Sequence, residues 1–123
     1  MTEAWLDFSL LTRAGLPLRR YAAGEKIFVE DDEGSVMYVV RSGRVNILTY
    51  GTVLESVGPN GMFGEMALID GSPRSATAVA SEPCELAPID QAAFAHLVRQ
   101  DPDFALRVMR LLAQRIRQMN ENL

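Results

Sequence analysis

Residues 61–77 read Gly-Met-Phe-Gly-Glu-Met-Ala-Leu-Ile-Asp-Gly-Ser-Pro-Arg-Ser-Ala-Thr, and this stretch is the most informative part of the chain. Two glycines flank Met62-Phe63, a short helical turn follows over 66–69, and a glycine-proline turn delivers Arg74 to the start of a strand. Glycines before a helix start let the backbone present free amides to an anion. An arginine adds a planar cation that grips two phosphate oxygens at once. The stretch therefore predicts a phosphate-binding loop.

Two side chains refine the expected chemistry of this loop. Ser75 supplies a hydroxyl donor and a backbone amide directly beside Arg74. Glu65 carries a negative charge that would repel a phosphate. We therefore expect Glu65 to face a neutral pair of hydroxyls, such as the edge of a ribose, while the amides face the phosphate.

On both sides of the loop, from residue 16 to 89, short apolar runs are separated by glycine-containing turns. Several runs alternate apolar with polar residues, as Val45-Asn46-Ile47 does, which is typical of a sheet buried on one face. Ser42-Gly43, between two runs, indicates a tight hairpin. Regular short strands with such turns predict a sandwich, a roll or a small barrel. The expected strands are 26–29, 36–41, 45–49, 53–57, 76–80 and 85–89.

A short amphipathic helix is expected over residues 3–14, before the roll. Gly15 and Pro17 end it. Its apolar side would carry Trp5, Phe8 and either Leu11 or Thr12. The chain is then a single α+β domain over 1–123, with the N-terminal helix in 1–15, the roll in 16–89 and two helices in 90–123.

The two C-terminal helices have recognisable start signals. Asp90 is placed to cap a helix that runs to about Arg99, with Phe94, Leu97 and Val98 inward. Asp101-Pro102 opens a second helix, which runs to about Asn120. One side of this helix carries a stripe of residues spaced by three and four, which consists of Ala105, Val108, Leu112, Arg115 and Met119. The stripe is suited either to a seam between two copies of the helix or to packing on the roll of its own chain.

Composition excludes several classes of function. The chain has 16 acidic and 12 basic residues and a net charge of −4, with no basic face before its last helix, so we expect no direct nucleic-acid binding by this chain alone. No run approaches the roughly 18–20 apolar residues that a membrane span requires. Glu3 stands where a secretory signal would carry bases, so we expect a cytoplasmic protein without a membrane anchor.

The sequence also contains few residues that could bind a metal ion or catalyse a reaction. Cys84 is the only cysteine and His96 the only histidine, whereas disulfide frameworks, metal-dependent β-rolls, haem sites and iron–sulfur clusters need more ligands of these types. No nucleophile–base pair is visible in the sequence. We expect Cys84 to be a small buried hydrophobe, and we expect neither a metal cofactor nor an enzyme.

The loop resembles the phosphate-binding cassette of the cyclic nucleotide-binding domains, found in the catabolite activator protein family and in protein kinase A regulatory subunits. The resemblance implies a cassette over 63–77, in which Glu65 accepts the ribose 2′-hydroxyl and Arg74 neutralises the cyclic phosphate. It implies that the phosphate is lined by Gly64, Ser75 and Ala76, and we expect Met66 to be a ligand-binding residue as well. With the resemblance, the expected fold is a mainly β antiparallel β-roll of the jelly-roll-like or double-stranded β-helix kind. The resemblance extends over roughly 16–120 through Gly24-Glu25, the acidic turn 30–34, Met37-Tyr38-Val39-Val40 and Ser42-Gly43-Arg44-Val45.

The same resemblance suggests how a base would be held. Ile47, Leu54 and Val57 align with apolar residues that stack on the base, although ordinary core packing explains each of them equally well. Met119 and Asn120 fall where relatives contact adenine with small hydroxyl residues, and Asn120 offers both a donor and an acceptor.

Two further residues bear on the choice of ligand and on the contacts of the last helix. Arg115, one turn before the adenine-contacting positions, is placed either to pair with Glu65 or to remain solvated. Ser75 stands where a threonine accompanies cGMP in the family, so the resemblance favours cAMP as the ligand over cGMP.

These features predict a regulatory module that binds a cyclic nucleotide and moves its last helix in response. The resemblance implies a homodimer through that helix. Two alternatives remain open at this point. The chain is the N-terminal sensor part of a DNA-binding transcription regulator whose helix-turn-helix domain is absent here, or it is a family member that has lost its ligand.

Overall fold

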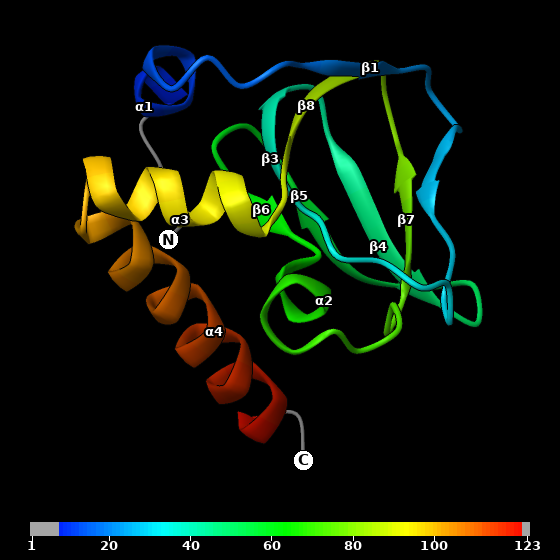
Figure 1. Cartoon of the computed structure of the whole chain (residues 1–123). Helices are drawn as coiled ribbons and strands as arrows, with labels where there is room; N and C mark the ends of the chain where they lie inside the picture. Colours follow the sequence, from blue (N-terminus) through cyan, green and yellow to red (C-terminus); the bar gives the residue numbers. More distant parts are fainter. Residues whose placement is uncertain (1–7, 122–123) are drawn as a thin grey trace.

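The computed structural model describes residues 8–121 and consists of a β-roll with helices against one of its sheets (Figure 1). The strands are β1 Arg19–Tyr21, β2 Lys26–Phe28, β3 Met37–Ser42, β4 Val45–Thr49, β5 Thr52–Val57, β6 Met62–Phe63, β7 Thr77–Ala80 and β8 Cys84–Ile89. The helices are α1 Phe8–Arg13, α2 Glu65–Asp70, α3 Gln91–Gln100 and α4 Asp103–Glu121. Two four-stranded sheets form the roll, with strand orders β1-β8-β3-β6 and β2-β7-β4-β5. All strand pairs are antiparallel, which confirms the predicted fold class.

The six expected strands are all present, with ends shifted by at most one residue. β1 and β6 were not predicted from the sequence. β6 has only two residues, Met62 and Phe63, and β1 has three, so neither is long enough to display an alternating pattern. β6 nevertheless matters for function, because its pairing with β3 places the start of the candidate phosphate loop at the edge of a sheet.

The predicted hairpin at Ser42-Gly43 is wrong. β3 and β4 belong to different sheets, so this turn crosses between sheets. A Cβ on Gly43 would lie 2.3 Å from the carbonyl oxygen of Pro83, which explains the glycine. The tight hairpin instead joins β4 to β5 through Tyr50 and Gly51, with φ values of 48° and 76°. Two successive positive φ values are those of a type I′ turn, whose twist matches paired strands.

The core is divided into two clusters by the sheet that contains β3. Successive side chains of a strand point to opposite faces. Tyr38 and Val40 accordingly belong to the cluster between the two sheets, and Met37 and Val39 to the cluster under the helices. All four are buried, so this strand is an uninterrupted apolar run in the sequence.

The C-terminal helices begin where the sequence predicts. The backbone amide of Ala93 donates to the Asp90 carboxylate at 2.8 Å, so Asp90 is the N-cap of α3. In α4, Phe104 is fully buried and its ring lies 5.3 Å from that of Phe94. This packing fixes the first turn of α4 against α3, and from there α4 extends past the roll (Figure 1).

The predicted stripe of α4 packs largely within its own chain. Val108 is buried in the helix-side cluster and Leu112 packs against that cluster, which supports the second interpretation of the stripe for these residues. The large apolar side chains that α4 exposes are Leu106, Met109 and Ile116. The side chain of Met119 and the whole of Trp5 lie outside the described part of the structure.

At the N-terminal end, α1 contributes two leucines to the helix-side cluster. Leu11 was expected on its inner face and is buried; Leu10 was not expected there but is equally buried. Thr12 is exposed. Within residues 8–121 we find no helix with the length and apolar character to cross a bilayer, and no group of three or more His, Cys, Asp or Glu side chains placed to hold a metal ion.

Cys84 is buried among the side chains between the two sheets, as expected for a small hydrophobe. Burial raises the pKa of its thiol, and the nearby Glu25 and Glu82 raise it further. Because the thiolate is the reactive form, we predict that iodoacetamide does not modify Cys84 at neutral pH while the protein is folded. Mass spectrometry before and after unfolding in guanidinium measures this, and rapid labelling of the folded protein would contradict it.

Candidate functional site

The backbone of the candidate loop is shaped by glycines at both ends of α2. Gly64 has a φ of 79° and precedes the helix, and Gly71 has a φ of 73° and ends it. These left-handed conformations favour glycine. The amide of Gly71 donates to the carbonyl of Ala67 at 3.0 Å, which closes the last turn. The loop thus leaves β6, forms one short helix and returns to β7 with Arg74 just before the strand.

The acidic turn 30–34 holds the backbone of Arg74. The Arg74 amide donates to the carbonyl of Asp32 at 2.9 Å, and the Asp31 amide donates to the carbonyl of Arg74 at 2.8 Å. This reciprocal pair of hydrogen bonds joins two segments that are about forty residues apart in the sequence. The turn therefore fixes the point from which the Arg74 side chain projects.

The Arg74 side chain is buried, with 6% of the residue exposed. Its Nη1 donates to the carbonyl of Gly64 at 3.0 Å and its Nη2 to the carbonyl of Val36 at 2.7 Å. Burial lowers the pKa of this guanidinium, while Tyr38 and Asp32 act in the opposite direction. A guanidinium remains charged in proteins, so the site holds a desolvated positive charge that backbone carbonyls alone satisfy only in part.

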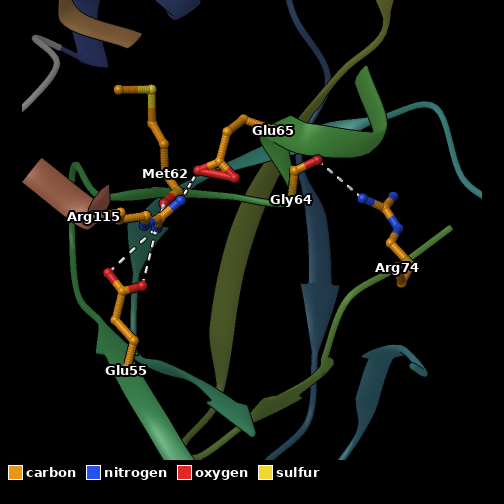
Figure 2. A network of polar contacts seen from close by, with 6 residues as sticks. All are labelled: Glu55, Met62, Gly64, Glu65, Arg74 and Arg115. Carbon is orange, nitrogen blue, oxygen red and sulfur yellow. Dashed lines mark hydrogen bonds and ion pairs between the residues drawn. The ribbon is translucent and has the colours of Figure 1, made fainter. Parts of the chain in front are cut away.

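Glu65 is equally buried and faces a different cation. It is 4% exposed, and its carboxylate forms an ion pair with Nη1 of Arg115 from α4. Nη2 of Arg115 also contacts Glu55 of β5 at 3.2 Å and donates to the carbonyl of Met62 at 2.8 Å. Figure 2 shows Arg115 between the two carboxylates. The pairing of Arg115 with Glu65, one of the two possibilities that the sequence offered, is therefore present.

Glu65 and Arg74 lie on either side of Gly64 (Figure 2). Arg74 reaches the Gly64 carbonyl from the side of β7, and Glu65 extends toward α4. The backbone at Gly64 thus lies between the buried guanidinium of Arg74 and the buried carboxylate of Glu65. A ligand that bridges the two would need an anionic group near a group that offers hydroxyls.

The remaining predicted site residues differ in exposure. Ser75 and Met66 are exposed, whereas Ala76 is buried. The residues proposed to stack on a base are spread across β4 and β5: Leu54 is 60% exposed, Ile47 is partly buried and Val57 is buried in the core between the sheets. Asn120 is exposed near the end of α4. The structure brings together the phosphate-loop residues and Arg115, and it does not place Asn120 in a described contact with them.

Comparison with known protein families agrees with this geometry. Residues 18–101, more than half of the chain, match the family model described as "Cyclic nucleotide-binding domain". The chain belongs to the cyclic nucleotide-binding domain family. The matched range contains Glu65, Arg74 and every strand of the roll.

Named relatives of this cyclic nucleotide-binding domain are regulatory proteins. It is 44% identical over 72 residues to a cAMP-dependent protein kinase regulatory subunit of Yarrowia lipolytica, which is 58% of this chain and 19% of that protein. It is 37% identical over 105 residues to the cyclic AMP receptor protein of Thermus thermophilus, or 81% of this chain and 49% of that protein. The crystal structure of the Thermus thermophilus catabolite activator protein superposes with a TM-score of 0.82 at 34% identity, over 95% of this chain and 58% of the other. The chain therefore spans about half or less of the length of these curated relatives.

Several residues that shape the site of this domain were missed by sequence reasoning. Phe28, Gly34 and Val36 surround the Arg74 guanidinium, and Glu55 shares Arg115 with Glu65. Phe28 and Val36 appear in the sequence as ordinary strand residues, and Glu55 as a surface acid. Their contacts depend on how the two sheets face each other, which no local pattern encodes.

Proposed function

We propose that this chain is a sensor module that binds cAMP, holds its cyclic phosphate at Arg74 and transmits binding through α4, with no catalytic step. The single observation that carries the proposal is the buried, charged guanidinium of Arg74 in a loop whose buried carboxylate, Glu65, is paired with Arg115 of α4. A buried cation with incomplete partners is stabilised by an anion that enters the site. The relatives named for cAMP support the choice of ligand.

In this proposal the phosphate contacts Arg74, the Ser75 hydroxyl and backbone amides of Gly64, Met66 and Ala76. The first amides of a helix have no acceptor within the helix, and those of α2 follow Gly64 directly. The ribose 2′-hydroxyl donates to Glu65. The base lies over β4 and β5, against Ile47, Leu54 and Val57, with Asn120 on its edge.

The ribose contact is the proposed origin of movement in α4. Glu65 is paired with Arg115 in this structure, so a hydroxyl that binds Glu65 changes the surroundings of Arg115. Glu55 contacts the same guanidinium and retains it when Glu65 turns to the ribose. A ligand shifts such an equilibrium only by its differential affinity for the two positions of the helix. The nucleotide therefore acts as a switch only if it favours one arrangement of Arg115.

Calorimetric titration of the protein with cAMP, cGMP and 5′-AMP, after removal of nucleotide carried over from expression, tests the ligand. We expect one cAMP per chain. It should bind more tightly than cGMP, because Ser75 stands where a threonine accompanies cGMP in the family. 5′-AMP should bind most weakly, because its open phosphate carries an additional charge into a partly desolvated site. Failure of all three to bind would mean that this family member has lost its ligand. Equal affinity for 5′-AMP would refute the cyclic-phosphate assignment.

We also propose a homodimer through the exposed side of α4. Leu106, Met109 and Ile116 are 41%, 57% and 58% exposed, and together with Ala113 they are spaced by three, four and three residues. This is the spacing of a two-helix seam. Asn120 continues the series by four, so the dimer would bring it toward the other copy.

Met109→Glu with Ile116→Glu is therefore expected to raise the dimer dissociation constant at least about tenfold, because two carboxylates would be desolvated in the seam. Sedimentation equilibrium measures the change. Gln118→Glu serves as the matched control, since this exposed residue lies on the opposite side of the helix from the series. A wild-type protein that is monomeric at high concentration would contradict the seam.

The length of the relatives favours the alternative in which the whole protein is a DNA-binding regulator. The receptor protein of Thermus thermophilus is about twice as long as the region it shares with this chain. A cytoplasmic regulator in which this module precedes a DNA-binding domain is consistent with that proportion. Sequencing the reading frame after Leu123 tests this alternative.

A further inference from the structure

Phe28 and Gly34 both lie close to the Arg74 guanidinium and form a slot for it. Its Cζ is 4.1 Å from the centroid of the Phe28 ring. At Gly34, an added Cβ would be 2.5 Å from Nε and 2.8 Å from Cζ of Arg74. Phe28 comes from β2 and Gly34 from the acidic turn that also binds the Arg74 backbone. The slot therefore leaves no space for a side chain at residue 34 while the Arg74 guanidinium keeps its position.

The hydrogen bonds of the guanidinium also constrain its position. Hydrogen bonds to the carbonyls of Gly64 and Val36 set the direction of the plane. Nε is buried and has no hydrogen-bond partner among the described residues. An unpartnered buried donor on a cation is costly, and the π face of an aromatic ring offsets part of that cost. Each terminal nitrogen retains a second hydrogen for an anion.

We propose that Phe28 and Gly34 are positioning residues for the phosphate contact of Arg74, holding its guanidinium flat in place before the nucleotide arrives. This inference rests on the proposed function and deepens it, because it names what sets the phosphate affinity of the site. An arginine held in its binding geometry loses less conformational entropy when the ligand binds. The proposed function assigns Phe28 no contact with the nucleotide, so Phe28 would act through Arg74.

The first readout is the proton NMR spectrum of the protein without ligand. A proton above an aromatic ring resonates upfield, so in the folded wild type the Arg74 Nε–H signal should lie upfield of the other arginine Nε–H signals. Its disappearance in Arg74→Lys assigns it. Phe28→Leu should move it back among the others, and Phe28→Tyr should leave it upfield. A signal at an ordinary position in the wild type would overturn the proposal.

The second readout is the affinity for cAMP. Phe28→Leu is expected to weaken it about 5- to 30-fold, the range of a partly to fully desolvated cation–π contact, and Phe28→Tyr should restore it to within about twofold. A Leu variant that binds as well as the wild type, or a Tyr variant that binds no better than the Leu variant, would contradict the proposal. Melting temperatures of all variants separate this effect from loss of folding.

Gly34→Ala provides a second variant that does not remove a core side chain. The three atoms nearest to the added methyl all belong to the Arg74 guanidinium and none to the backbone, so the fold should tolerate the methyl while the guanidinium shifts. We expect at least a fivefold loss of cAMP affinity, roughly the effect of a lost cation–π contact, and a melting temperature close to that of the wild type. Unchanged affinity would count against the slot. If the wild type shows the upfield signal but binds no nucleotide, the proposed function fails and the slot remains as a structural feature.

Discussion

Replacing Arg74 by alanine should raise the dissociation constant for cAMP by a factor of about 30 to several thousand. Arg74 is 6% exposed, and truncating one partner of a buried, hydrogen-bonded charge pair costs about 2–5 kcal/mol of binding free energy. The loss arises because the phosphate would be desolvated without a cation. Isothermal titration calorimetry with the purified variant measures it.

The matched control for this variant is Arg20→Ala. The Arg20 side chain is 86% exposed and contacts Glu85 at 3.1 Å on the surface of the roll. Exposed ion pairs of this kind contribute about 0–1 kcal/mol to stability, and Arg20 lies outside the proposed site. We therefore expect less than a twofold change in cAMP affinity, about the reproducibility of such a titration. Equal affinities of the two variants would remove Arg74 from the phosphate contact.

The second large effect concerns stability. Arg115→Ala should lower the free energy of unfolding by about 3 kcal/mol, the lower end of the range for breaking a buried ion pair. It would leave the Glu65 carboxylate buried without its cation, because Glu65 is 5% exposed at its side chain. The lower end applies because the Arg115 side chain itself retains 22% exposure. Urea unfolding followed by circular dichroism measures the change.

Two further variants distinguish this explanation from a general effect of shortening a side chain of α4. Arg107→Ala, on the same helix, breaks a more exposed contact with Asp101 at 3.7 Å and should cost less than about 1 kcal/mol. Glu65→Leu combined with Arg115→Leu should recover part of the stability, because the stranded charge is gone. If Arg115→Ala costs no more than Arg107→Ala, the ion pair does not hold α4 to the loop.

The sequence predicted the position of the loop and its short helix, where the signal is local. Gly64, Glu65 and Arg74 lie within one short stretch. Their residue types alone indicate groups that bind an anion and a hydroxyl. The Asp90 cap was predictable for the same reason, since a capping residue and its helix are neighbours in the chain. Arg115 was recognised as a possible partner of Glu65 only through the resemblance to a known family.

Features that depend on pairing between distant segments were missed. The turn at Ser42-Gly43 has the composition of a hairpin, but the strand that leaves it joins the other sheet. Phe28 is an apolar residue of a three-residue strand, and nothing nearby in the sequence shows that it faces Arg74. Glu55 reaches Arg115 across sixty residues. In each case the determining contact is set by the packing of the two sheets and α4.

A crystal structure of this protein with cAMP tests the central claim most directly. The phosphate oxygens should lie within hydrogen-bonding distance of the Arg74 guanidinium and of the amides that follow Gly64, with a ribose hydroxyl on Glu65. Density for the nucleotide elsewhere on the molecule, with Arg74 still bonded only to the carbonyls of Gly64 and Val36, would contradict the account.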